Sequence, residues 1–222
     1  MPIRRIVLPV LCGLLLCGCA AQQLPPKPTG FLVNYSKLSP GKEGQMGLRY
    51  VNPDFRLANY DAILVSRVQT WLKGEGQDKN IDADTLHEMV RYFEDALMRE
   101  VGKHMPVTDT LGPRVLVLRV GITGIETAAA TAAAPVSPAT ITPAGAARKK
   151  AAGGAADDAI RVNSASMEME LLDGVTFARL AASVDKRGGS AASSRSALQE
   201  ALDAFDFWAA LIGQRIGEGR AK

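Results

Sequence analysis

The sequence predicts an α+β protein, a two-layer sandwich in which two helices cover one face of a mostly antiparallel, four-stranded sheet. Residues 83–103 and 196–216 each repeat apolar residues at helical spacing, along one stripe only. Residues 165–185 alternate as a hairpin with one apolar face does. Because each element has a single face to bury, the order β-α-β-β-β-α favours both helices on the same side of the sheet.

The segments before the first helix are less regular. Residues 31–38 (FLVNYSKL) alternate weakly and predict an edge strand or a segment fastened along the sheet edge, turned by Pro40-Gly41. Residues 50–60 are irregular and rich in aromatic side chains. Residues 62–71 (AILVSRVQTW) begin β-branched and apolar on both faces, which indicates an interior strand.

The first helix has recognisable ends. Asp82 is placed to cap its N-terminus, and Gly102 and Pro106 are placed to end it. Its predicted buried stripe consists of Leu86, Met89, Val90, Phe93, Leu97 and Val101. After Gly112-Pro113, residues 114–126 predict a strand. The residues expected on one face of that strand are Leu116, Leu118, Val120 and Ile122.

The hairpin that follows has a register that the sequence predicts. If residues 173–176 form a four-residue loop, residue 172 faces residue 177. The apolar pairs are then Met169 with Leu180, Met167 with Ala182 and Ala165 with Val184. On the other face Glu170 meets Arg179, an opposite-charge pair that stabilises a sheet.

The second helix begins at a capping box, Ser196-x-x-Gln199, and is expected to end near Ile216, before Gly217 and Gly219. Its buried stripe consists of Leu198, Leu202, Phe205, Ala209, Ile212 and Ile216, with Trp208 flanking it.

The N-terminus carries a targeting signal. Arg4 and Arg5 precede an apolar run, residues 6–16, which is too short to span a bilayer. Leu16-Cys17-Gly18-Cys19 then resembles a bacterial lipobox. The resemblance implies diacylglycerol transfer to the Cys19 sulfur, cleavage after Gly18 and acylation of the new amine by a chain such as palmitate. The alternatives are an ordinary secretory peptide or an uncleaved anchor with incidental cysteines.

The sequence predicts a chain organised in four parts, of which the first is removed by cleavage. Residues 1–18 are the signal peptide, 19–30 a lipidated Pro-rich tether, 31–216 a single periplasmic domain and 217–222 a tail. Because Ala20 and Ala21, and not Asp, follow Cys19, the lipobox implies export to the outer membrane. Extended at ~3.3 Å per residue, residues 20–30 of the tether reach about 36 Å.

Composition excludes several classes of protein. With 47% hydrophobic and 22% charged residues, the 222-residue chain is neither disordered throughout nor a multi-span membrane protein. Loss of Arg4 and Arg5 leaves 24 basic against 23 acidic residues, so the net charge of +3 falls to +1 and does not favour nucleic acid. Since all three cysteines lie in residues 12–19, the mature domain has no free thiol for a disulfide, a metal site or a nucleophile.

Residues 127–159 break the pattern of the domain. Fifteen of these 33 residues are Ala, and Thr, Pro and Gly supply much of the rest, which is typical of a flexible insertion. Alternatively, Thr142-Pro143 begins a short helix there. The basic cluster Arg148-Lys149-Lys150 is a solubilising face or a contact with anionic headgroups.

Five segments in order resemble a bacterial lipoprotein family catalogued as domain of unknown function 3313. They are GFLVNYSKL, LRYVNPDFRLANYDAILVSRVQTW, GPRVLVLRVGITGIE, SASMEMELLDGVTFARLAASVDKR and AFDFWAALIGQRI. The resemblance implies an outer-membrane-type lipoprotein with an α+β periplasmic domain, and it supplies no established chemistry and no catalytic residues to carry over. Members usually have Thr-Gly in the hairpin turn, whereas here Phe177 follows Thr176, so Gly174 is expected to take the positive φ.

Candidate chemistry is sparse. Glu168 and Glu170 point the same way from one strand, so they suit acid–base work, or Glu170 simply pairs with Arg179 on a solvated or helix-free face. His87-Glu88 lies in HEMVR, which lacks the second His of a zinc motif. No cofactor or metal motif occurs. Six aromatic residues before position 72 are expected to fasten the N-terminal segment to the sheet or to bind a partner. They are Phe31, Tyr35, Tyr50, Phe55, Tyr60 and Trp71.

These features predict a non-catalytic lipoprotein, anchored at Cys19 in the outer membrane and facing the periplasm, that acts through protein or envelope contacts. One alternative is a binding module for a small lipid or glycan, held between helices and sheet. A second is a hydrolase using Glu168 and Glu170 or His87, which requires these groups to converge in a cleft.

Overall fold

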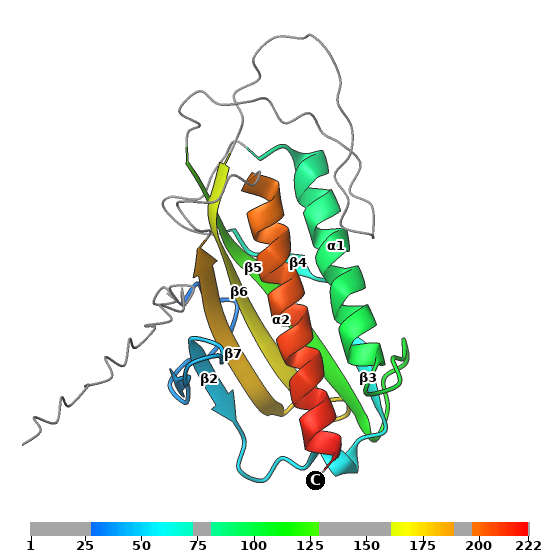
Figure 1. Ribbon diagram of the computed structural model, residues 1–222. Helices are drawn as coiled ribbons and strands as arrows, with labels where there is room; N and C mark the ends of the chain where they lie inside the picture. Colours follow the sequence, from blue (N-terminus) through cyan, green and yellow to red (C-terminus); the bar gives the residue numbers. More distant parts are fainter. Residues whose placement is uncertain (1–27, 73–80, 129–160, 189–196, 222) are drawn as a thin grey trace, which may run out of the picture.

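A computed structural model describes residues 28–72, 81–128, 161–188 and 197–221. Cys19, the insertion beyond residue 128 with its expected helix and basic cluster, and the Ser196 cap lie outside the described residues. Two helices pack side by side on one face of a single sheet (Figure 1). The predicted α+β class and the placement of both helices on one face are therefore confirmed.

The sheet is larger than predicted and it is mixed. Within the described residues it has seven strands: six follow the order β1-β2-β7-β6-β5-β3, and the seventh, β4, pairs with β5 beside this path. The strands are β1 (Ser39–Pro40), β2 (Leu48–Val51), β3 (Ala62–Val65), β4 (Gln69–Thr70), β5 (Val115–Ala128), β6 (Arg161–Asp173) and β7 (Arg179–Gly188). The prediction of a four-stranded, mostly antiparallel sheet was wrong because β1, β2 and β4 are too short to produce an alternating pattern. A helix connects β3 to β5, and such a crossover allows the parallel pairing observed between them.

Residues 62–71 do not form the predicted interior strand. They form two short strands, of which β3 lies at the end of the strand order. The outer side of β3 is partly satisfied, because the amide of Ile63 donates to the carbonyl of Pro106 (2.9 Å) and the amide of Thr108 donates to the carbonyl of Ile63 (2.9 Å). Because residues 106–108 cover the outer edge of β3 in this way, β3 can be as apolar as an interior strand although it ends the strand order.

The first helix matches its prediction. Helix α1 (Ala83–Gly102) begins at Asp82, whose Oδ1 accepts a hydrogen bond from the amide of Thr85 at 2.8 Å. Its buried residues are Met89, Phe93, Ala96, Leu97 and Val101, with Leu86 and Val90 partly buried beside them.

The second helix continues past its predicted end. Helix α2 (Ala197–Arg220) passes through Gly217 and Gly219, which do not terminate it. A Cβ at Gly217 would lie 2.6 Å from Nδ1 of His104, and one at Gly219 would lie 2.8 Å from Cδ2 of Leu57. The two glycines therefore serve close packing within the helix.

The main core lies between the helices and the sheet. The rings of Phe93 and Phe205 stack with centroids 4.7 Å apart, and Trp208 packs at 6.0 Å from each of them. The indole of Trp208 is fully buried and donates from Nε1 to Oδ2 of Asp185 at 2.6 Å. On the sheet side the core receives the predicted face of β5 and the apolar residues of β6, Ala165, Met167, Met169 and Leu171.

The hairpin is present, but its predicted register was wrong. Met169 pairs with Ser183, Met167 with Asp185 and Glu170 with Ala182, and a bulge separates Leu171 from Leu172. Because directly opposed residues share a face, Ala182 and Val184 lie beside Glu170 and Glu168 and not beside the methionines. Two changes cause the shift. The turn closes one residue later than predicted, where the amide of Asp173 donates to the carbonyl of Ala178 at 3.0 Å, and Leu180 is an extra residue on β7 between the partners of Leu172 and Leu171.

The positive φ in this turn belongs to Phe177 (φ 55°) and not, as expected, to Gly174. A left-handed conformation costs a residue with a Cβ about 1–2 kcal/mol. Gly174 is needed for another reason, because a Cβ there would lie 2.4 Å from the carbonyl oxygen of Val115.

Asp173 holds the turn together and makes it sensitive to acid. Its Oδ1 accepts from the amides of Thr176 (2.8 Å) and Val175 (3.0 Å), and its Oδ2 accepts from the Tyr60 hydroxyl (2.9 Å). These hydrogen bonds, the one from the Thr176 amide foremost, lower the pKa of Asp173 to about 2. Burial, together with the hydrogen bond to Asp173, raises the pKa of Tyr60 to about 12.

Because the pKa of Asp173 is lower in the folded protein, its stabilising contribution is complete above its ordinary pKa of about 3.9 and is lost as the pH falls toward 2. We expect Asp173→Asn to lower the free energy of unfolding at pH 7 and to reduce the loss of stability between pH 4 and pH 2. Urea unfolding across this pH range measures both effects. Asp95→Asn, at an exposed position of α1, is the control, and equal acid sensitivity in the two variants would contradict the assignment.

Candidate functional site

The helix-free face of the sheet is covered by the N-terminal segment, residues 28–38. At one end the ring of Phe31 meets Trp71 edge-to-face at 6.0 Å, and at the other the carbonyl of Asn34 accepts from Nη1 of Arg179 at 2.6 Å. Phe31 and Leu32 are buried in a second, smaller apolar cluster with Ala182 and Val184. The expected strand at 31–38 is therefore wrong, whereas the alternative of a fastened segment is confirmed. The segment crosses the strands instead of following their edge.

Glu168 is the centre of this attachment. Its Oε1 accepts from the amide (2.8 Å) and the hydroxyl (2.9 Å) of Thr29, and its Oε2 accepts from the amide of Leu32 (3.1 Å) and the hydroxyl of Tyr35 (2.6 Å). The Glu168 side chain is fully buried. Four donors from the N-terminal segment therefore converge on one buried carboxylate of β6. Burial, followed by the hydrogen bond to Glu168, raises the pKa of Tyr35.

Glu170 lies beside it between two guanidinium groups. Arg179 donates from Nε to Oε2 of Glu170 at 2.9 Å, and Nη1 of Arg119 contacts Oε1. Arg119 also lies over the ring of Phe31, 5.3 Å from its centroid. The expected Glu170–Arg179 pair is confirmed, but this face is not solvated, since the Glu170 side chain is only 5% exposed.

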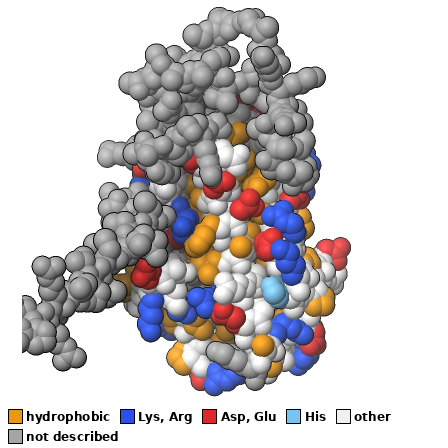
Figure 2. All heavy atoms as spheres, viewed as in Figure 1, with side chains coloured by type: hydrophobic (Ala, Val, Ile, Leu, Met, Phe, Trp, Pro, Cys, Tyr) orange, Lys and Arg blue, Asp and Glu red, His pale blue; other side chains and the backbone are white. Residues whose placement is uncertain are grey.

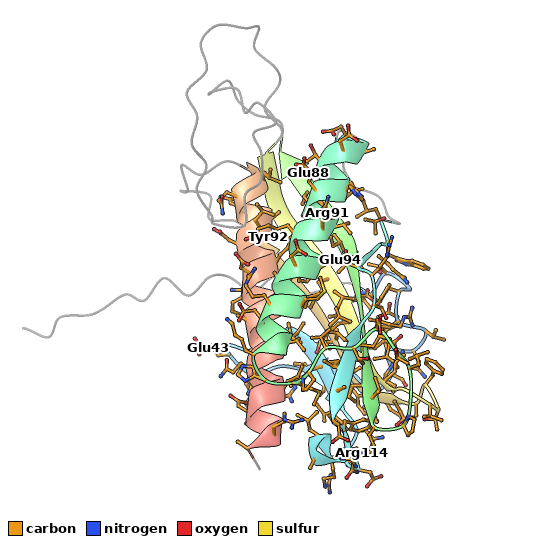
Figure 3. The ribbon with its side chains drawn as sticks, turned by 90° about the vertical axis from the view of Figure 1, so that its right-hand side faces the viewer. Glu43, Glu88, Arg91, Tyr92, Glu94 and Arg114 are labelled. Atoms are coloured by element: carbon orange, nitrogen blue, oxygen red, sulfur yellow. The ribbon has the colours of Figure 1, made fainter. Side chains whose placement is uncertain are left out.

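The groups proposed for a hydrolase do not converge. Glu168 and Glu170 lie buried on the helix-free face, whereas His87 and Glu88 are exposed on α1, where Figure 3 shows Glu88 near the start of the helix. Within the described residues, no three His, Cys, Asp or Glu side chains are grouped to hold a metal ion. The two glutamates are therefore occupied by structural contacts.

The helical face is occupied by mutually paired polar groups. Figure 2 shows acidic and basic side chains next to one another over α1 and α2. Asp206 accepts from Arg99 (3.1 Å) and from the Tyr92 hydroxyl (2.6 Å), and Figure 3 shows Tyr92 pointing from α1 toward α2. Burial and the Asp206 carboxylate raise the pKa of Tyr92 to about 12.

The space between helices and sheet, where the alternative function would place a small ligand, is filled by the rings of Phe93, Phe205 and Trp208. A pocket of about 220 Å³ lies instead on the helix-free face, beside the N-terminal segment. Asn34, Lys37, Tyr50, Asn52 and Arg179 supply its polar groups, and Leu38 and Ala182 its apolar wall.

Sequence reasoning missed this pocket, although it noticed the aromatic residues around it. Phe31, Tyr35 and Trp71 fasten the N-terminal segment as expected. Tyr50 lines the pocket, whereas Phe55 and Tyr60 contact each other at 5.9 Å near the main core. The pocket joins residues 34–52 to residues 179–182, so no local sequence pattern reports it.

Among the described residues, no helix combines the length and the apolar character needed to cross a bilayer. The lipoprotein YdcL of Escherichia coli strain K12, described as uncharacterized, is 34% identical over 121 residues, which cover 53% of this chain and 54% of that protein. The same values hold for YdcL of Escherichia coli O157:H7. The chain thus spans about half the length of the curated relatives it matches.

Solved structures resemble the chain only remotely. The PelC dodecamer from Paraburkholderia phytofirmans has a TM-score of 0.40 at 10% identity and covers 74% of this chain and 94% of its own. A homolog of neuraminyllactose-binding hemagglutinin from Helicobacter pylori has a TM-score of 0.39 at 9% identity and covers 75% and 86%.

The family comparison covers most of the chain. The family model described as "Protein of unknown function (DUF3313)" matches residues 27–212. The match includes both helices up to Ile212, all seven strands and the fastened N-terminal segment. The chain therefore belongs to the DUF3313 family of proteins of unknown function.

Proposed function

We propose that this protein is an outer-membrane lipoprotein, anchored by acyl chains on Cys19, whose periplasmic domain acts through protein or envelope contacts and not through catalysis. The lipobox supports the anchor, as does the lipoprotein name of the Escherichia coli relatives. Acyl chains contribute about 0.8 kcal/mol per buried CH₂, so two or more chains attach a protein stably.

The observation that carries the non-catalytic role is the state of Glu168 and Glu170. Both carboxylates are buried, and their hydrogen bonds hold the N-terminal segment and two arginines. A general acid or base needs access to a substrate proton, which these contacts deny.

The same contacts shorten the free part of the tether between the membrane and the domain. Because Thr29 is bound to Glu168, the segment that separates the domain from Cys19 is residues 20–28. Nine residues span at most about 30 Å. The domain therefore works close to the membrane surface.

We expect the wild-type protein to incorporate labelled palmitate and to fractionate with outer membranes on a sucrose gradient, because Cys19 supplies the acylated sulfur. Cys19→Ser should abolish both, and Cys17→Ser, a matched change at the variable lipobox position, should preserve both. Ala20→Asp should move the protein to the inner-membrane fraction. Labelling of Cys19→Ser at the wild-type level would refute the anchor.

Crosslinking in intact envelopes, followed by mass spectrometry, tests the contact role. We expect specific crosslinks from the domain of the wild-type protein that are lost in Cys19→Ser, because the soluble form leaves the membrane surface. Recovery of no partner or envelope component above the control would count against the proposal.

A second candidate function, binding of a small lipid or glycan ligand, is favoured by one observation. The pocket beside the N-terminal segment presents five polar side chains in about 220 Å³.

A further inference from the structure

We infer that this pocket binds the oxyanion group, carboxylate or phosphate, of a small envelope glycan or lipid headgroup. The inference rests on the second candidate function, small-ligand binding, and adds the chemical class of the ligand. It depends on the charges and hydrogen-bond donors of the pocket and on its size.

The pocket has an excess of positive charge. Lys37 lies over the ring of Tyr50, with Nζ 5.6 Å from its centroid, and within the described part of the chain it forms no ion pair. Arg179 shares Glu170 with Arg119, so one carboxylate faces two guanidinium groups. Cationic groups of this kind attract and bind oxyanions.

Arg179 is held rigidly and keeps donors for a ligand. Its Nε and Nη2 bond to Oε2 of Glu170 at 2.9 and 2.8 Å, and its Nη1 donates to the carbonyl of Asn34 at 2.6 Å. These contacts use three of the five N–H groups of a guanidinium, so two remain for a ligand as far as the described residues are concerned. A fixed guanidinium loses little conformational entropy when it binds a ligand.

The two amide side chains of the pocket also present donors. Oδ1 of Asn34 accepts from the amide of Ser36 at 2.8 Å, and Oδ1 of Asn52 accepts from the amide of Asp54 at 3.0 Å. Each bond engages one of the two lone pairs of the amide oxygen, and among the described residues neither NH₂ group donates a hydrogen bond. The pocket is therefore rich in donors and poor in acceptors, which favours an oxyanion over a neutral polyol that needs both.

The size of the pocket limits the ligand. At about 220 Å³ it is smaller than the roughly 300–1,000 Å³ typical of sites for drug-sized molecules. Leu38, Ala182 and the Tyr50 ring supply the apolar surface against which a single sugar ring or a headgroup can pack. A polymer would engage the pocket only through one terminal or charged unit.

Isothermal titration of the full-length protein in a non-ionic polyoxyethylene detergent tests the inference. The probes are glucuronate, glucose 6-phosphate and glycerol 3-phosphate, with glucose and glycerol as neutral counterparts. We expect at least one charged probe to bind at least about tenfold more tightly than its neutral counterpart. Tighter binding of glycerol 3-phosphate identifies a lipid headgroup as the source, and tighter binding of the sugar acids identifies a glycan.

Lys37→Gln should weaken binding of the charged probe roughly fivefold, whereas Lys42→Gln, on the same stretch of chain but outside the pocket, should change it less than about twofold. Tyr50→Phe keeps the ring and removes only the hydroxyl, so weaker binding in this variant reports the loss of a hydrogen-bond donor and not the loss of the fold. If glucose binds as tightly as glucuronate, ligand binding stands and the oxyanion assignment is overturned. If no probe binds, both the inference and the second candidate function are overturned.

Discussion

Replacement of Glu168 by alanine is expected to lower the free energy of unfolding by about 3–5 kcal/mol and to release the N-terminal segment from the sheet. The change leaves the amides of Thr29 and Leu32 and the hydroxyl of Tyr35 without their shared acceptor. A buried donor without a partner costs about 1–3 kcal/mol. Urea unfolding measures the loss, and amide hydrogen exchange at Thr29 and Leu32 reports the release directly.

Two further variants separate charge from shape at this site. Glu168→Gln keeps the volume but presents an NH₂ group to donors, so its stability should lie between those of the wild type and Glu168→Ala. Glu88→Ala, at an exposed position of α1, should change stability by less than about 0.5 kcal/mol. Unchanged exchange protection of Thr29 and Leu32 in Glu168→Ala would show that the carboxylate does not hold the segment.

Release of the N-terminal segment should also affect ligand binding in the pocket. Asn34, Lys37 and Leu38 form one wall of the pocket, and the segment that carries them is held by Glu168, which does not line it. A Glu168 variant that remains folded should therefore bind a charged probe more weakly. The tether continues directly into the residues that form this wall of the pocket.

The second large effect is expected where the helices cross. A Cβ at Gly213 would lie 2.7 Å from the carbonyl oxygen of Glu100, which is backbone and cannot move aside as a side chain would. Gly213→Val should therefore force α1 and α2 apart and cost about 4 kcal/mol or more, although glycine itself disfavours a helix by about 1 kcal/mol. Thermal and urea unfolding measure the change.

Ala210→Val provides the control one turn earlier on α2. Its side chain is exposed, so the substitution carries only the helix-propensity cost of valine, roughly 0.5 kcal/mol. Similar stability of the two valine variants would mean that the helices do not depend on close approach at Gly213.

Local patterns predicted the helices and one strand face correctly. The stripe of α1 from Leu86 to Val101 and the face of β5 from Leu116 to Ile122 appear in the structure as predicted. Each depends on a period within a single element, which sequence records directly. Asp82, three residues before its bonding partner Thr85, is predictable for the same reason.

Features that depend on distant pairing were not predictable. The four-residue loop assumed after Leu172 gave the wrong partners because the turn closes one residue later, between Asp173 and Ala178, and because Leu180 is an extra residue on β7. Gly217 and Gly219 suggested a helix end because nothing local indicates that His104 and Leu57 pack against them. The short strands β1 and β2 are defined by long-range pairing, because β2 pairs with β7 and β1 pairs with β2.

The sequence by itself determined the α+β class, both helices, the family and the lipobox expectation at Cys19. Each of these depends on periods, motifs or the order of segments, which can be read along the chain without knowing which distant residues meet. Only the tertiary structure decided what the two strand glutamates do. The partners of Glu168 lie 133 to 139 residues earlier in the chain. Glu168, which the local sequence suggests as a catalytic carboxylate, therefore binds the N-terminal segment. The pocket forms where that segment meets β2 and β7.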